Sequence, residues 1–206
     1  MSEELHASLK TAVKGTTLIF AGMVAGNLLW FGIKILIVRN TTVDEFGLYS
    51  LAITIPTVLA ALAALGTGEG TVRNITAFLG QGKRDDADAL ARASLHINFI
   101  SSMTAGILLY ILAGILARYV FYKPEIATPL RVLSITVPLF TLIGILGSIM
   151  RAHGFVRHKL YYQDVGHPIY YLLFLGIILL TGFTFIKLIY AFVLAIALVF
   201  VSLSSY

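Results

Sequence analysis

Residues 18–38 read LIFAGMVAGNLLWFGIKILIV, an apolar run of 21 residues interrupted by one charged side chain, Lys34. A helix that crosses the hydrocarbon core of a bilayer needs about 20 mostly apolar residues. The run is too long for the apolar part of a cleaved signal peptide, and the acidic Glu3 and Glu4 precede it. We therefore expect a retained membrane-spanning helix here.

The composition of the whole chain points the same way. Its 206 residues are 58% hydrophobic and 12% charged, with a mean hydropathy of +0.91, whereas soluble domains carry about 25% charged residues. A soluble enzyme, a disordered tail and a nucleic-acid-binding domain are therefore excluded. The absence of cysteine rules out a disulfide framework and Cys-ligated zinc or iron–sulfur centres. We expect no catalytic residue, no cofactor, no metal site and no nucleic-acid partner.

Six apolar runs predict an all-α, polytopic fold, a six-helix transmembrane bundle without a separate soluble domain. Ahead of the first run, Leu5, Leu9 and Val13 recur at helical spacing among polar residues. Residues 1–17 are therefore expected to form a cytoplasmic amphipathic helix at the membrane interface, and residues 18–206 the six-span lobe. The runs cover residues 18–38, 48–72, 95–117, 132–150, 169–186 and 188–203.

Basic residues predict the orientation, since Lys and Arg concentrate on the cytoplasmic side of membrane proteins. With the N-terminus inside, nine of the fifteen fall on that side, together with both longer loops. We therefore predict a multi-pass protein of the cell membrane with both termini in the cytoplasm. The nine are Lys10, Lys14, Arg73, Lys83, Arg84, Arg92, Arg151, Arg157 and Lys159.

Three motifs follow one another along these runs. Residues 39–50 read RNTTVDEFGLYS, and residues 65–75 read LGTGEGTVRNI, followed by GKRD at 82–85. The third motif begins with Pro124-Glu125 and LRVL at 130–133. It continues through the mid-helix Pro138 to RAHGF at 151–155. In order and spacing they resemble the polysaccharide and oligosaccharide flippase family. These Wzx-type exporters of lipid-linked oligosaccharides belong to the multidrug and oligosaccharidyl-lipid exporter superfamily.

The resemblance covers roughly residues 10–206 and implies a function. Such flippases move a lipid-diphosphate-linked oligosaccharide or polysaccharide precursor from the cytoplasmic to the outer leaflet by alternating access. Family members have twelve or fourteen spans in two lobes, so the six runs resemble the N-terminal lobe. The implied partners are membrane lipid, the lipid-linked glycan, and either a C-terminal lobe or a second copy of the chain. One departure is Thr42-Val43, where the family often has Gly-Pro.

The first run carries the main candidates for substrate binding. Asn27, Trp30 and Lys34 stand at i, i+3 and i+7, on one helix face, and an ionisable group inside a membrane is a functional candidate. The resemblance implies that such cationic residues hold the lipid diphosphate in a central cavity. Alternatively, the long Lys34 side chain extends to the nearby interface. Asn98, on a polar stripe of the third run, is a further cavity candidate, with helix packing as its alternative.

Other residues suggest gating and motion. Glu69 is acidic within the second run, and Arg73 four residues later is its expected partner in a structural or gating ion pair. Pro56 and Pro138 are hinge candidates, although prolines also kink static helices. Aromatic residues at the start of the fifth run, Tyr161, Tyr162, His167, Tyr170 and Tyr171, predict an interfacial belt.

Three other functions remain open. A drug or cation antiporter of the same superfamily needs an intramembrane carboxylate, and Glu69 is badly placed for that role. A non-transporting six-span module is possible, and so is an intramembrane prenyl transferase that binds Mg²⁺ through Asp85 and Asp88. His153, His158 and His167 lack the i, i+4 spacing of a helical zinc pair.

Overall fold

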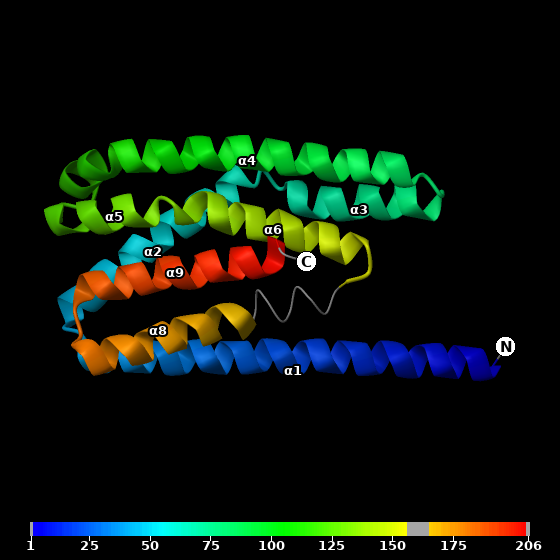
Figure 1. The fold of residues 1–206 in the computed structure, drawn as a ribbon, viewed down its shortest axis with the longest axis horizontal. Helices are drawn as coiled ribbons and strands as arrows, with labels where there is room; N and C mark the ends of the chain where they lie inside the picture. Colours follow the sequence, from blue (N-terminus) through cyan, green and yellow to red (C-terminus); the bar gives the residue numbers. More distant parts are fainter. Residues whose placement is uncertain (1, 156–164, 205–206) are drawn as a thin grey trace.

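A computed structural model describes residues 2–155 and 165–204 and contains helices and turns, without a β-strand in that part of the chain (Figure 1). The all-α prediction is therefore confirmed. The helices are α1 (Ser2–Asn40), α2 (Val43–Ala63), α3 (Thr67–Gly80), α4 (Arg84–Ile115), α5 (Ala127–Leu133), α6 (Thr136–Ala152), α8 (His167–Thr181) and α9 (Phe185–Ser204). A π-helical turn η1 (Leu116–Val120) and a 3₁₀ turn η2 (Pro124–Ile126) join α4 to α5.

The first helix is continuous over 39 residues, from Ser2 to Asn40. The amphipathic segment expected at residues 1–17 is therefore continuous with the helix of the first apolar run. Helix α1 lies alongside α8 at the edge of the bundle (Figure 1). The position of its first turns at a membrane interface stays a prediction.

The stretch TTVDE begins α2 through a capping box. The Thr42 backbone N–H donates to Glu45 Oε2 at 2.9 Å, and the Glu45 backbone N–H donates to Thr42 Oγ1 at 3.3 Å. These two bonds satisfy backbone donors that the first turn of a helix leaves without partners. The capping chemistry explains locally why Thr42 and Glu45 stand in the first motif.

The second apolar run is divided into two helices rather than one. Helix α2 continues without interruption through the buried Pro56 and ends at Ala63, and α3 begins at Thr67. Between them Leu65 and Gly66 adopt left-handed conformations, with φ of 51° and 66°. Glycine suits such a conformation because it has no Cβ. The interruption therefore lies nearer the end of the run than the hinge candidate Pro56.

The fourth run is bent. The segments Pro124–Leu133 and Thr136–Ala152 meet at 40°. Pro138 lies in the first turn of α6 and has no N–H to donate, and the Ser134 carbonyl instead accepts from the Val137 N–H at 3.2 Å. Pro138 therefore accompanies a real bend in the helix, and its movement as a hinge stays a prediction.

Lengths and hydropathies of the described helices identify four candidate membrane spans: Phe20–Asn40, Val43–Gly80, Arg84–Val120 and Phe185–Ser204. The bent pair Pro124–Leu133 and Thr136–Ala152 would be a fifth. Helix α8 is apolar but has only 15 residues, about 22 Å at 1.5 Å per residue. A hydrocarbon core is about 30 Å thick, so the sixth crossing stays a prediction.

The helices run back and forth along the long axis of the molecule (Figure 1). The start of α1, the turn between α3 and α4 and the end of α6 lie toward one end, and the turn between α8 and α9 lies toward the other. Helix α9 runs toward the end at which α1 begins. Which end faces the cytoplasm stays a prediction.

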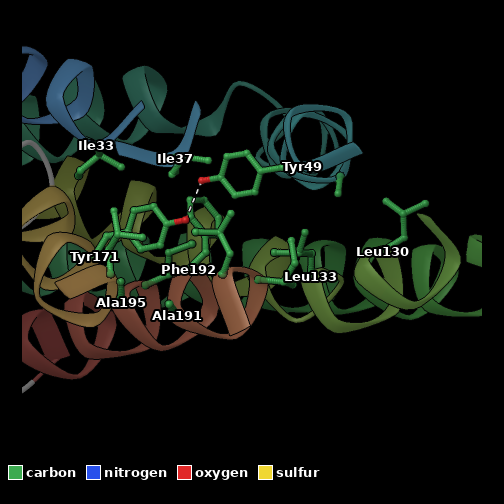
Figure 2. Close-up of a cluster of buried hydrophobic side chains, with 14 of the residues drawn as sticks. Ile33, Ile37, Tyr49, Leu130, Leu133, Tyr171, Ala191, Phe192 and Ala195 are labelled. Atoms are coloured by element: carbon green, nitrogen blue, oxygen red, sulfur yellow. Dashed lines mark hydrogen bonds between the residues drawn. The ribbon is translucent and has the colours of Figure 1, made fainter. Parts of the chain in front are cut away.

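The main core lies where α8 and α9 pack against α1, α2, α5 and α6. Figure 2 shows Tyr49 of α2 and Tyr171 of α8 meeting among the aliphatic side chains of Ile33 and Ile37. The two tyrosine hydroxyls are hydrogen-bonded at 2.8 Å. Pairing these hydroxyls offsets the cost of removing them from water.

The prediction of an interfacial aromatic belt near the fifth run is wrong for His167 and Tyr171. Tyr171 is fully buried, and His167 is buried at the first position of α8. Tyr170 is half-buried and its hydroxyl lies 3.3 Å from Ser202 Oγ of α9. Tyr161 and Tyr162 lie outside the described residues. His167, Tyr170 and Tyr171 instead contact neighbouring helices.

Close packing of α4 on the bend leads to a first prediction. A Cβ at Gly106 would lie 3.0 Å from the Ser134 carbonyl oxygen and 3.2 Å from Pro138 Cδ. Gly106→Val should destabilise the protein by about 1–3 kcal/mol more than Gly176→Val, because overpacking forces helices apart. Gly176 is a matched helical control with no heavy atom within 4 Å of its added Cβ. Thermal unfolding in detergent measures both, and equal losses would contradict the close approach.

Candidate functional site

A pocket of about 350 Å³ opens between α1, α2, α6, α8 and α9. We call it the aromatic pocket, because aromatic rings from all five helices line it. Two consecutive turns of α1 contribute Trp30 and Lys34, beside the buried Ile33 and Ile37 that anchor the helix. The aromatic rings are those of Trp30, Phe46, Tyr49, Phe140, His167 and Phe192.

Lys34 is the charged side chain among the residues that line this pocket. Its side chain is exposed, and the lining includes no aspartate or glutamate. Among the described residues Lys34 forms no salt bridge. The pocket therefore carries an unneutralised positive charge at its wall, next to polar hydroxyls from Ser50 and Thr54 of α2.

Trp30 and His167 form the centre of the aromatic cluster. Their ring centroids lie 5.0 Å apart with an interplanar angle of 77°, an edge-to-face arrangement typical of stable aromatic pairs. The centroid of the His167 ring also lies 5.4 Å from that of Phe192 and 6.2 Å from that of Phe140. His167 is 9% exposed, and its Nε2 has no hydrogen-bond partner in the described part of the chain.

The sequence does not predict His167 as a pocket residue. Its spacing from the other histidines excludes a helical zinc pair, and the tyrosines around it indicate an aromatic belt. The one local signal is its place directly before Pro168, at the start of a helix too short and too apolar to show a polar face. Only the packing of α8 against α1 and α9 brings its ring to Trp30.

The remaining cavity candidates lie elsewhere. Asn27 is exposed on α1, and its Nδ2 donates to the Met23 carbonyl at 2.9 Å. Asn98 is buried, and its Nδ2 donates to Thr67 Oγ1 and to the Ser94 carbonyl, both at 2.8 Å. Asn98 lines a second pocket of about 280 Å³ between α2, α3, α4 and α6. Trp30 and Lys34 therefore line the aromatic pocket, Asn98 lines the second pocket, and Asn27 lines neither.

The expected pairing of Glu69 with Arg73 is wrong. Arg151 Nη2 lies 2.9 Å from Glu69 Oε1, so the ion pair joins α3 to the C-terminal turn of α6. Arg151 Nη2 also contacts Ser148 Oγ at 3.1 Å, whereas Arg73 is exposed. The positive charge of Arg151 suits the negative end of the α6 dipole. A partner 82 positions away in sequence is invisible to an i, i+4 rule.

This ion pair gives a second prediction. In a double-mutant cycle, Glu69→Ala and Arg151→Ala should show a coupling free energy of about 0.2–1 kcal/mol, as for other pairs with an exposed partner. The Glu69 side chain is 80% exposed and that of Arg151 is 27% exposed. The control cycle of Glu69→Ala with Arg73→Ala should show negligible coupling. Thermal unfolding measures both, and a larger coupling to Arg73 would contradict the observed pairing.

Comparison with known proteins identifies the family. The sequence profile of the MatE family matches residues 20–172, which is more than half of the chain and includes α2 to α6. Searches of curated proteins and of solved structures give no significant match. Proteins of the MatE family are membrane transporters of an exporter superfamily and are not enzymes. The chain therefore belongs to the MatE family, and its apolar helices make it a multi-pass membrane protein of the exporter class.

Proposed function

We propose that the chain is a lobe of an exporter that moves a lipid-diphosphate-linked saccharide from the cytoplasmic to the outer leaflet. The observation that carries this proposal is Lys34 in the wall of the aromatic pocket, with no carboxylate among the described residues that line it. The exposed Lys34 ammonium group attracts anionic groups, and this Coulomb attraction strengthens when a bound substrate displaces water and lowers the local dielectric. A diphosphate is such a group.

The positive charge of the pocket favours this function over that of a drug or cation antiporter. A drug or cation antiporter of the same family would need a carboxylate to attract its substrate and coupling ion. Glu69, an acidic residue of the candidate span Val43–Gly80, already pairs with Arg151 at 2.9 Å. Neither of these two residues lines the aromatic pocket. The positive wall therefore favours an anionic substrate over a cationic one.

An interrupted helix and a bent helix support an alternating-access mechanism. The interruption lies at Leu65 and Gly66, and the 40° bend lies before Pro138. Broken helices are common where transporters build their binding sites and change conformation. In this proposal a second lobe, or a second copy of the chain, supplies the opposite wall of the transport path, and membrane lipid surrounds the assembly.

The third prediction tests the role of Lys34 in transport. Full-length protein in proteoliposomes should move a fluorescent polyisoprenyl-diphosphate saccharide at least about tenfold more slowly after Lys34→Ala, because one charge-assisted contact contributes about 1.5–3 kcal/mol. Lys34→Arg keeps the charge and should retain most of the rate. The charge-matched control is Lys123→Ala, which removes an exposed lysine whose contact is a 3.9 Å pair with Asp44.

Two outcomes would refute the proposal. One is a wild-type transport rate in the Lys34→Ala protein. The other is export of a cationic dye, with no movement of the lipid-linked saccharide, in the wild-type protein. The second outcome would assign the chain to the drug and cation antiporters of the family.

A further inference from the structure

We propose that the aromatic pocket binds the sugar ring nearest the diphosphate, with His167 Nε2 hydrogen-bonded to one of its hydroxyl groups. This inference rests on the proposed function and adds the part of the substrate that the pocket recognises. It makes His167 a specificity-determining residue for that first sugar. Neither the family match nor the sequence motifs point to this residue.

One ring nitrogen of the buried His167 side chain is unpaired among the described residues. The side chain is 9% exposed, and Nε2 has no hydrogen-bond partner among the described residues. More than nine in ten buried polar groups in proteins have a partner, so an exception needs a reason. The ring lines the aromatic pocket while neighbouring side chains cover Nε2, so a ligand there supplies the missing partner once those side chains shift. Imidazole can donate or accept at Nε2, which matches the dual character of a hydroxyl group.

The walls around this nitrogen suit a sugar better than a flat or purely apolar ligand. Trp30 and His167 stand at 77° to each other, so two walls meet at a corner. A sugar ring has apolar C–H faces and a polar rim of hydroxyl groups. Its face can cover an aromatic ring while one hydroxyl reaches the imidazole. Binding sites of this kind combine mostly apolar walls with a few placed polar groups.

Volume and charge identify which sugar of the substrate enters. At about 350 Å³ the pocket lies near the lower limit of the 300–1,000 Å³ that is common for ligand sites. It therefore admits a small head group and not an oligosaccharide. Lys34 lines the same pocket as His167, so a phosphate held by Lys34 places the sugar attached to it within reach of the imidazole. Sugars further along the glycan lie outside.

The chain carries its own probe for this site, since Trp30 is the one tryptophan among its 206 residues. The full chain in lipid nanodiscs is titrated with glucose 1-phosphate, galactose 1-phosphate and N-acetylglucosamine 1-phosphate. Inorganic phosphate and a methyl glycoside serve as the two half-ligands. We expect at least one sugar phosphate to change Trp30 fluorescence saturably, with an affinity at least about tenfold above that of inorganic phosphate.

Variants separate the roles of the two pocket residues. His167→Phe keeps an aromatic ring and should remove the tenfold advantage of the sugar phosphate, whereas His167→Gln, which keeps a hydrogen-bonding nitrogen, should restore part of it. Lys34→Ala should weaken sugar phosphate and inorganic phosphate alike. His96→Phe is the matched control, because His96 is exposed on α4 and its Nδ1 lies 2.8 Å from the Arg92 carbonyl.

Three results would overturn the inference. Only one of them would also refute the proposed function. Unchanged sugar-phosphate binding in both His167 variants would remove His167 from recognition. Lys34-dependent binding of inorganic phosphate, with no gain from any of the three sugars, would refute the sugar subsite and leave the proposed function intact. Absence of binding by every phosphate would refute both.

Discussion

Backbone groups freed inside a bilayer must find new partners, and this requirement shapes the packing around the interruption between α2 and α3. Two carbonyls near the end of α2 accept hydrogen bonds from side chains of other helices. Ser101 Oγ of α4 donates to the Ala63 carbonyl at 2.8 Å. Thr141 Oγ1 of α6 donates at 3.2 Å to the Ala60 carbonyl, which also accepts from the Ala64 backbone N–H at 3.0 Å. Side chains of α4 and α6 thus hold the interruption between α2 and α3, and these four helices pack together.

The described helices carry two kinds of charged site. In one, Glu69 and Arg151 neutralise each other at 2.9 Å, and the nearby hydroxyls of Thr71 and Ser94 pair at 3.0 Å. In the other, Lys34 faces the aromatic pocket without an acidic partner in the described chain. Paired polar groups stabilise helix contacts, whereas an unpaired cation is available to a ligand. Phe140 of α6 lines both pockets and separates them.

The sequence predicted those features that depend on residues close together along the chain. Apolar runs indicated membrane helices, and helical spacing placed Trp30 and Lys34 near each other on α1. Prediction from the sequence failed where the partner of a side chain comes from another helix. Arg151 rather than Arg73 pairs with Glu69, and Asn98 is bonded to Thr67 in a different pocket. His167 and Tyr171 looked like interfacial aromatics because their burial depends on how α8 packs.

By itself the sequence determined that the protein is a bundle of apolar membrane helices, because hydropathy and helix periodicity are local properties of the chain. Its family came from the sequence as well, through the profile match over residues 20–172. Tertiary structure decided which side chains share a pocket. The distance from Trp30 to His167, 5.0 Å between ring centroids, spans 137 positions of sequence and arises only when α8 packs on α1. Burial, pairing and the unpaired His167 nitrogen follow from that contact, since each depends on neighbours brought together by folding.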